Sequence, residues 1–251
     1  MFISSLTTSL LSFIGTLIWV VLCGRFSIAI RPAALKKRFD AELGDSFTPR
    51  YNAAPGQDLP VILNRSPKKI QLCRWGFIPS WQKKVPTGAR LINARAETIM
   101  EKRTFQRAFQ KQRCLVLADG FYEWKKTPQR RIPYRFVLHD EAPFAFAGIW
   151  SQWTGTDQSV VTSFSIITTD ANAVVADVHH RMPVLLQPQD EASWLTMPPE
   201  DAITLLNPYP SDLMRAYPVS PRVNSPVNDD PSVIKPIKRR KERVKRIDDF
   251  F

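Results

Sequence analysis

The chain has few histidines, glycines and cysteines, and these shortages exclude several kinds of site. Its 251 residues include 3 His, 9 Gly and 3 Cys. Cys23, Cys73 and Cys114 are widely spaced and odd in number, which supports neither a disulfide framework nor a CxxC zinc site. No internal repeat or glycine-rich phosphate loop is present. A reducing, intracellular setting fits this cysteine usage best.

Acidic residues are also scarce relative to basic ones. The 35 Lys and Arg outnumber the 23 Asp and Glu and give a net charge of +12. Residues 235–251 carry eight Lys or Arg and three Asp or Glu, a net +5, which leaves +7 for the rest. This balance favours a polyanionic partner, either nucleic acid or an acidic membrane surface.

Long apolar runs are confined to the amino-terminal end. Residues 1–22 carry no charge and are long enough to span a bilayer as a helix. A secretory signal normally has a positive amino-terminal region and a small-residue cleavage site, and this segment has neither. Leu22 also stands where a lipoprotein site needs a small residue. A retained membrane span is therefore one alternative for this leader.

From Cys23 onward, short apolar runs broken by Pro, Gly and Asn predict strands. The strand candidates are 23–30, 59–64, 70–78, 113–124, 133–138, 144–150, 160–169 and 182–186. The helix candidates are 32–39, 96–111, 170–177, 189–195, 199–206 and 211–216. Because the two kinds of element do not alternate regularly, we expect an α+β fold. Its core is predicted to be a mostly antiparallel β-sheet or barrel flanked by short helices.

Three parts are expected along the chain: an apolar leader (1–22), one folded domain (23–236) and a basic flexible tail (237–251). Residues 207–236 hold seven prolines, which exclude long regular elements but allow an ordered, packed segment.

Two stretches combine polar groups suited to binding anions. Cys23 precedes Gly24 and Arg25, a setting that favours an accessible nucleophile beside an anion, although most cysteines are simply buried. Asn93 and Arg95 lie two residues apart, so on an extended chain they share a face. An amide and a guanidinium there can hold a phosphate or carbonyl, but a surface strand has the same pattern.

Two further stretches offer proton transfer. Glu123 lies among Phe121, Tyr122 and Trp124, where desolvation can raise a carboxyl pKa toward neutrality; the alternative is a solvent-facing side chain. His179 begins a tandem histidine pair before Arg-Met-Pro and can serve as a proton shuttle near neutral pH.

Together these stretches resemble the SRAP family, the SOS response-associated peptidases, which are known for sensing abasic sites in single-stranded DNA. The matching motifs are Cys23–Phe26, Tyr51–Pro55, Trp75–Trp81, Asn93–Glu97, Cys114–Trp124 and His179–Pro183. They follow one another in the family order, and the match runs from Cys23 to about Pro236.

The resemblance implies that Cys23 is the mature amino terminus and that its α-amine and thiol form a thiazolidine with the aldehyde of an abasic site. Glu123 then transfers protons, His179 assists ring opening and Asn93 holds the reactive end. Neither a metal nor an organic cofactor is implied. The DNA-binding residues implied by the resemblance are Arg25, Asn52, Trp75, Trp81, Arg95 and Arg181. For Trp75 and Trp81, core packing is an equal alternative to base stacking.

The segment before Cys23 departs from the family pattern, because an amide-bonded cysteine has no free amine. Leu22 stands where relatives have their initiator Met, so we expect residues 1–22 to be upstream sequence absent from the native protein. Removal by the protein itself is the alternative. It corresponds to the second predicted activity, a thiol autopeptidase that uses Cys23.

The tail predicts a partner. Ile247, Phe250 and Phe251 have the spacing of the short peptide that docks on sliding clamps, and a frayed basic end is the alternative. The remaining expectations are a monomer that acts on DNA in the cytoplasm, with no membrane attachment in the mature protein.

Overall fold

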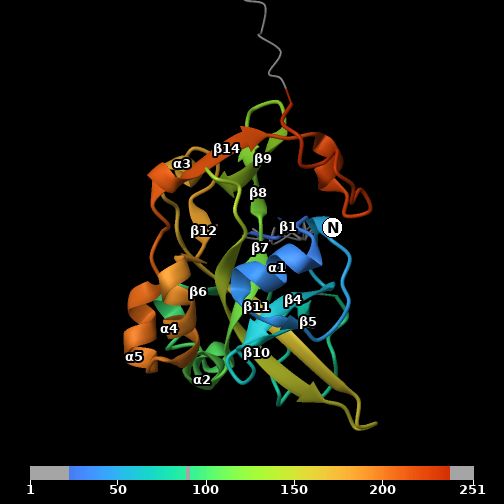
Figure 1. The fold of residues 1–251 in the computed structure, drawn as a ribbon, viewed down its shortest axis with the longest axis vertical. Helices are drawn as coiled ribbons and strands as arrows, with labels where there is room; N and C mark the ends of the chain where they lie inside the picture. Colours follow the sequence, from blue (N-terminus) through green and yellow to red (C-terminus); the bar gives the residue numbers. More distant parts are fainter. Residues whose placement is uncertain (1–22, 89–90, 238–251) are drawn as a thin grey trace, which may run out of the picture.

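Five strands close into a small barrel at the centre of the protein, in a computed structural model that describes residues 23–88 and 91–237 (Figure 1). They are β4 (Asp58–Leu63), β5 (Lys69–Trp75), β7 (Arg113–Ala118), β10 (Phe144–Thr154) and β11 (Val160–Asp170). Neighbours in the order β11-β10-β7-β4-β5 are antiparallel, and a parallel pairing between β5 and β11 closes the ring. The predicted α+β class with a mostly antiparallel barrel is therefore confirmed.

Short strands extend the edges of this barrel. They are β2 (Glu42–Leu43) on β5, β6 (Asn93–Arg95) and β12 (Arg181–Pro183) on β11, and β13 (Leu185–Leu186) on β10. Thr168 of β11 pairs with Arg95 on one side and with Pro183 on the other. The strands β6 and β12 therefore flank the same end of β11, which brings two predicted site segments together.

A second sheet of five antiparallel strands stands beside the barrel. Its strands, in spatial order, are β14 (Met214–Pro218), β9 (Arg131–Leu138), β8 (Gly120–Lys126), β1 (Phe26–Ile28) and β3 (Arg50–Ala53). The chain enters this sheet directly from the barrel, because Asp119 alone separates β7 from β8. This bend interrupts the predicted strand 113–124 and connects the barrel core to the strand that carries Glu123.

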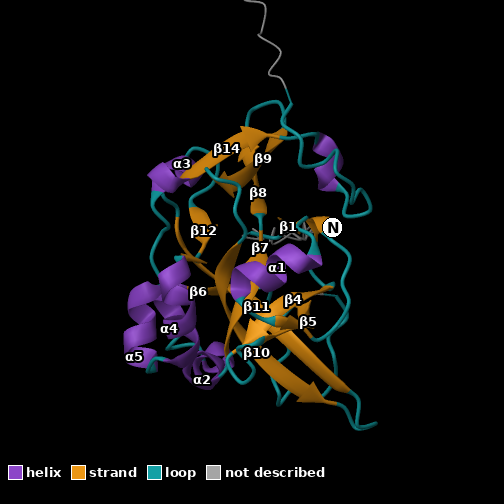
Figure 2. Cartoon of the chain, in the orientation of Figure 1, coloured by secondary structure: helices purple, strands orange, loops and turns teal. Residues whose placement is uncertain are grey.

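Helices cover the outside, most of them on one side of the barrel (Figure 2). They are α1 (Pro32–Phe39), α2 (Arg103–Lys111), α3 (Ala173–Ala176), α4 (Glu191–Thr196) and α5 (Pro199–Ala202). Both α2 and α4 pack on β7. All six residues of β7 are consequently buried, since the barrel interior covers one face and helices cover the other.

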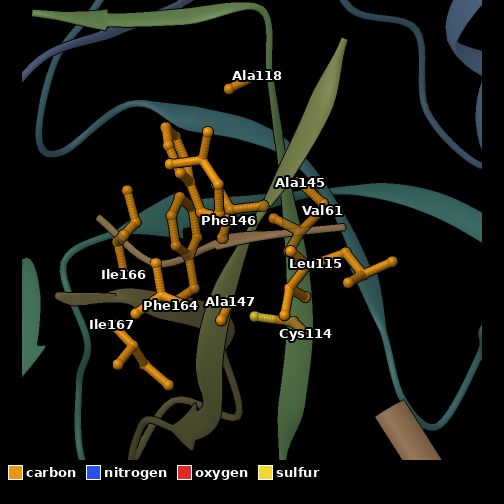
Figure 3. Close-up of a cluster of buried hydrophobic side chains, with 14 of the residues drawn as sticks. Val61, Cys114, Leu115, Ala118, Ala145, Phe146, Ala147, Phe164, Ile166 and Ile167 are labelled. Carbon is orange, nitrogen blue, oxygen red and sulfur yellow. The ribbon is translucent and has the colours of Figure 1, made fainter. Parts of the chain in front are cut away.

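Val61, Phe146 and Phe164, from β4, β10 and β11, belong to the buried apolar cluster that fills the barrel (Figure 3). Gly148 of β10 pairs with Cys114 of β7, and a Cβ at Gly148 would lie 2.8 Å from the Cys114 sulfur. The close approach of these two strands therefore requires glycine at this position.

The proline-rich carboxyl-terminal segment wraps over the outer face of the second sheet. Val219, Val223 and Val233 form a separate apolar cluster with Tyr122 of β8. Asp229 accepts the main-chain N–H groups of Tyr51 and Asn52 at 2.6 and 2.9 Å, so this segment is tied to β3. We call residues 219–237 the carboxyl-terminal strap.

Two of the predicted helices need correction. Residues 211–216 form a 3₁₀ turn (Ser211–Leu213) and then enter β14, because the edge of β9 offers this segment a full ladder of partners. Residues 96–111 do not form one helix: a 3₁₀ turn (Ala96–Thr98) precedes α2, which starts at Arg103. In both places tertiary pairing and packing override local propensity.

The predicted leader (1–22) and the predicted clamp-binding side chains Ile247, Phe250 and Phe251 lie outside the described residues. Within the described ranges, no helix is both long enough and apolar enough to cross a membrane.

Candidate active site

Cys23 and Glu123 are in direct contact although they are 100 residues apart in sequence. Strand β1 pairs with β8 in a register that places Phe26 opposite Phe121. Cys23 lies just before β1, and its main-chain nitrogen donates a hydrogen bond of 2.8 Å to Glu123 Oε1. The pairing of these two strands therefore brings the predicted nucleophile to the predicted proton carrier.

Both side chains of this pair are buried, with 1% of Cys23 and 3% of Glu123 exposed. Burial raises the pKa of the Glu123 carboxyl to about 8, against the opposing effect of the N–H groups that it accepts from Cys23 and Trp124. Burial, and then the adjacent Glu123, raise the pKa of the Cys23 thiol well above its ordinary value. At neutral pH the site accordingly holds a carboxylic acid beside a thiol rather than two anions.

The backbone of Cys23 is strained. Its φ angle is +40°, in the left-handed region that favours glycine. Strain of this kind persists only where the surroundings hold it, and it is concentrated at functional sites. Here Cys23 is held at its nitrogen by the hydrogen bond to Glu123, and the chain after it is held by the pairing of β1 with β8 that begins at Phe26.

An ion pair behind the two residues locks β1 onto β8, and sequence reasoning did not find it. Asp119 accepts the Ser27 hydroxyl at 2.6 Å and the Ala29 N–H at 2.8 Å, and it pairs with Arg135 at 3.0 Å. Since the Asp119 and Arg135 side chains are each 8% exposed, this network is shielded from water. A usable signal was Asp119, an acidic residue within the strongly apolar run 113–124.

A chain of stacked and tilted aromatic rings fixes β1 from the barrel side. Trp75 lies 4.9 Å from Phe26 and 6.4 Å from Phe164, measured between ring centroids. Its indole N–H donates to the Ile92 carbonyl, and its side chain is fully buried. Trp75 thus offers no surface to a base, which favours the core-packing alternative. Trp81, by contrast, is 69% exposed.

Arg25 and Asn52 are held together under the carboxyl-terminal strap. Arg25 Nη1 donates to Asn52 Oδ1 and to the Val223 carbonyl, each at 2.7 Å. The buried Asn52 amide also donates to the carbonyls of Val223, Ser225 and Asn228. Asn52 therefore has no polar atom to spare for DNA, and its position orients Arg25 instead. Burial lowers the pKa of Arg25.

Asn93 and Arg95 both lie on β6, as the extended-chain interpretation predicted. The Oδ1 atom of Asn93 is buried and has no hydrogen-bond partner among the described residues. Arg95 is exposed, and within the described ranges its guanidinium has neither a hydrogen bond nor an ion pair. These are the properties of a free acceptor and a free cation beside the end of β11.

Arg181 on β12 is occupied by protein groups. Its guanidinium pairs with both Glu97 oxygens at 2.7 and 2.9 Å, with Asp170 at 2.8 Å and with the Thr168 carbonyl at 2.7 Å. Arg181 thereby clamps the segment after β6 to β11. A phosphate could reach this guanidinium only in competition with two carboxylates.

His179 is half-buried beside β12. Its Nδ1 lies 3.1 Å from the Arg181 main-chain nitrogen and 3.2 Å from the Arg181 carbonyl oxygen, so it accepts from the first when unprotonated and donates to the second when protonated. Its ring lies 4.4 Å from that of His180, at an interplanar angle of 30°. Burial lowers the pKa of His179 against the opposing effect of a hydrogen bond to the Arg181 backbone, and the charges of His180 and Lys126 lower it further, which favours the neutral ring.

No group of three His, Cys, Asp or Glu side chains in the described part of the chain is arranged to hold a metal ion. The site that does exist is a buried cysteine at the start of a strand, facing a carboxyl group on the neighbouring strand. Fold and site together define a barrel protein with a candidate active site centred on a cysteine.

The chain belongs to the SRAP family: the family model "SOS response associated peptidase (SRAP)" matches residues 22–226. It is 38% identical over 221 residues to the abasic site processing protein YoqW of Bacillus subtilis, covering 85% of this chain and 99% of that one. It is 32% identical to the abasic site processing protein HMCES of mouse, over 76% of this chain and 66% of that protein. A solved structure of a Bacteroides thetaiotaomicron protein superposes with a TM-score of 0.79 at 28% identity, covering 86% of this chain and all of that one.

Proposed function

We propose that this protein senses abasic sites in single-stranded DNA and becomes covalently linked to them through Cys23. The names of the curated relatives support the substrate class. The observation that carries the proposal is the buried contact between the Cys23 nitrogen and the Glu123 carboxyl. In a chain that begins at Cys23, that nitrogen is the α-amine.

The proposed reaction begins with the α-amine. As a free base it adds to the open-chain aldehyde of the abasic sugar and gives a carbinolamine. Protonated Glu123 donates a proton to the departing hydroxyl, one water leaves, and the resulting Glu123 carboxylate takes the nitrogen proton, so a neutral imine forms. The Cys23 thiol then adds to the imine carbon while its proton passes to the nitrogen, which closes a five-membered thiazolidine. The last step is intramolecular and gains most from proximity.

The neighbouring residues have supporting roles in this proposal. Neutral His179 assists opening of the sugar ring, and the free Oδ1 of Asn93 accepts a sugar hydroxyl. Arg95 and Arg25 bind flanking phosphates, and the exposed Trp81 stacks on an unpaired base. Asn52 and Arg181 act indirectly, by positioning Arg25 and Glu97. The linked protein would shield the lesion from nucleases and from error-prone copying.

The test uses protein that begins at Cys23 and a single-stranded oligonucleotide with one abasic site. We expect a species that survives denaturing electrophoresis, with a mass equal to protein plus DNA minus one water. Cys23→Ser retains the amine and should give only an imine that borohydride traps. An oligonucleotide whose abasic aldehyde has been reduced to the alcohol is the control. If the protein beginning at Cys23 gives no adduct, the proposal fails.

Autoproteolysis is a second candidate, favoured by the strained Cys23 backbone and by the position of Glu123 at the nitrogen of the Leu22–Cys23 bond. The thiol would attack the Leu22 carbonyl while Glu123 protonates the departing nitrogen, and water would hydrolyse the thioester. Intact mass distinguishes the outcomes. A chain of 251 residues that loses its leader, while the Glu123→Gln variant retains it, would support this activity. Equal masses for both proteins would exclude it.

A sliding-clamp partner for the tail rests on the spacing of Ile247, Phe250 and Phe251 alone. Deleting residues 244–251 should abolish clamp binding. An unchanged clamp affinity would remove this part of the proposal.

A further inference from the structure

Residues 125–131, which comprise the end of β8, the turn after it and the first residue of β9, are strongly basic, and we call them the basic hairpin. Four of its seven side chains are basic: Lys125, Lys126, Arg130 and Arg131. No acidic residue occurs between Glu123 and Asp140 in the sequence. Lys125 is half-exposed and the other three are exposed. Across the described ranges, none of the four side chains is engaged in a hydrogen bond or an ion pair with another group.

The hairpin has a fixed shape. The Thr127 N–H and hydroxyl donate to the Arg130 carbonyl at 2.9 and 2.8 Å, and the Arg130 N–H donates back to the Thr127 hydroxyl at 3.1 Å. These bonds close the turn without using any of the charged groups. The positive charges are therefore presented from an ordered backbone, which lowers the entropy cost of binding a ligand.

Two of the charges directly oppose each other. Lys126 of β8 pairs with Arg131 of β9 in the antiparallel register. Like charges at directly opposite positions destabilise a strand pair. Within the part of the chain that the structure describes, neither side chain forms an ion pair that would offset this repulsion. A bound anion would remove it, so the arrangement is suited to a ligand rather than to stability.

The hairpin is also close to the reactive groups. Lys125 follows Glu123 by two residues on β8 and therefore shares its side of the strand, whereas Lys126 and its partner Arg131 project from the other side. Lys126, the last residue of β8, lowers the pKa of His179 through its charge. An extended polyanion that delivers one of its units to Cys23 would thus run past these side chains.

We propose that the basic hairpin binds the phosphate backbone of single-stranded DNA next to the reactive nucleotide. The proposal rests on the proposed function and names a surface that it leaves unassigned. Lysine and arginine side chains that neutralise phosphates give affinity that does not depend on sequence and that falls as salt is raised. The hairpin would hold the strand and leave the chemistry to Cys23 and Glu123.

The double variant Lys126→Gln/Arg131→Gln tests this surface, with Arg103→Gln/Arg107→Gln as the matched control. The control pair is exposed, lies four residues apart on α2, and likewise removes two like charges that face each other. In Figure 1, α2 lies at the lower end of the molecule and the second sheet at the upper end. Both variants lose the same net charge.

Binding of an undamaged single-stranded oligonucleotide is measured against salt concentration for the three proteins. Two lost phosphate contacts should lower the slope of log affinity against log salt by about 1.4, at about 0.7 for each contact on a single strand. This corresponds to roughly tenfold weaker binding at about 0.15 M salt. The control should keep the wild-type slope. The melting temperature of the hairpin variant should not fall.

Equal slopes for the hairpin variant and the control would overturn the proposal, because net charge alone would then explain binding. Covalent adduct formation at saturating abasic DNA is measured in parallel, and the hairpin variant should still reach the wild-type yield. If wild type forms no adduct while the hairpin variant shows the reduced slope, the proposed function fails and the DNA-binding surface stands. If wild type forms the adduct and the slopes are equal, the proposed function stands and the DNA-binding surface on the basic hairpin is excluded.

Discussion

Replacing Glu123 by glutamine is expected to change how the stability of the 251-residue chain depends on pH. Burial raises the Glu123 pKa from 4.5 to about 8. Each pKa unit corresponds to about 1.4 kcal/mol, so ionising this carboxyl costs about 5 kcal/mol more in the folded protein than in the unfolded chain. Because its side chain is only 3% exposed, solvent does little to reduce this cost.

The direction of this pH dependence follows from the number of protons bound in the folded and unfolded states. Between pH 4.5 and about pH 8 the folded protein keeps the Glu123 proton, which the unfolded chain has lost. The free energy of unfolding therefore falls as pH rises through this window, by up to about 1.4 kcal/mol per pH unit from this group. Glutamine retains an oxygen that accepts the Cys23 N–H but does not titrate. The free energy of unfolding of the variant, relative to that of wild type, should therefore increase as pH rises through this window, by about 5 kcal/mol in total.

Urea unfolding of both proteins at intervals from about pH 4.5 to 8.5 measures this difference. Glu101→Gln, at an exposed position, is the matched control and should run parallel to wild type. If the Glu123→Gln and wild-type curves are also parallel, Glu123 ionises as an ordinary carboxyl and the protonation state proposed for the site is wrong.

Three further predictions concern other parts of the molecule. Asp119→Asn leaves a buried guanidinium without its counter-charge and should lower the free energy of unfolding by about 3–5 kcal/mol, measured by urea unfolding, and should also slow adduct formation. Gly148→Ala should cost about 1–3 kcal/mol because its Cβ would lie 2.8 Å from the Cys114 sulfur, and adding Cys114→Ala should recover part of that loss. His180→Asp replaces a group that lowers the His179 pKa with an anion, so an NMR titration should show the His179 midpoint at higher pH; an unchanged midpoint would contradict the coupling.

Much of the fold could be predicted because its strands are short apolar runs punctuated by Pro, Gly and Asn. The runs at 133–138 and 160–169 lie within β9 and β11. The helix predicted at 32–39 has the predicted bounds, since Pro32 occupies its first turn. The helix prediction for residues 211–216 was wrong because this segment pairs with β9, which is more than 70 residues away in sequence. Local signals do not report such a pairing.

The candidate site could likewise be predicted only in part from the sequence. Cys23 and Glu123 could be singled out by chemistry, but their contact depends on the pairing of β1 with β8, which no local pattern specifies. Asn52 and Trp75 have side chains that suit DNA binding, and only the fold shows that one is used up by main-chain carbonyls and the other by aromatic packing. Lys126 was missed for the opposite reason, because a charged turn is usually just solvated.

The chemistry proposed for Cys23 needs opposite protonation states in two adjacent groups, and burial favours both. The amine must be a free base to attack, while loss of water from the carbinolamine needs an acid. In water near pH 7, an α-amine with a pKa of about 8 is mostly protonated and a glutamate is ionised. Moving such a pair out of water penalises the ammonium and the carboxylate alike. In the 251-residue chain, where the Cys23 nitrogen is an uncharged amide, the raised pKa of Glu123 has the direction that this penalty requires. A substitution that admitted water beside Glu123 would therefore leave both groups in contact as an ion pair, and would slow crosslinking without removing either one.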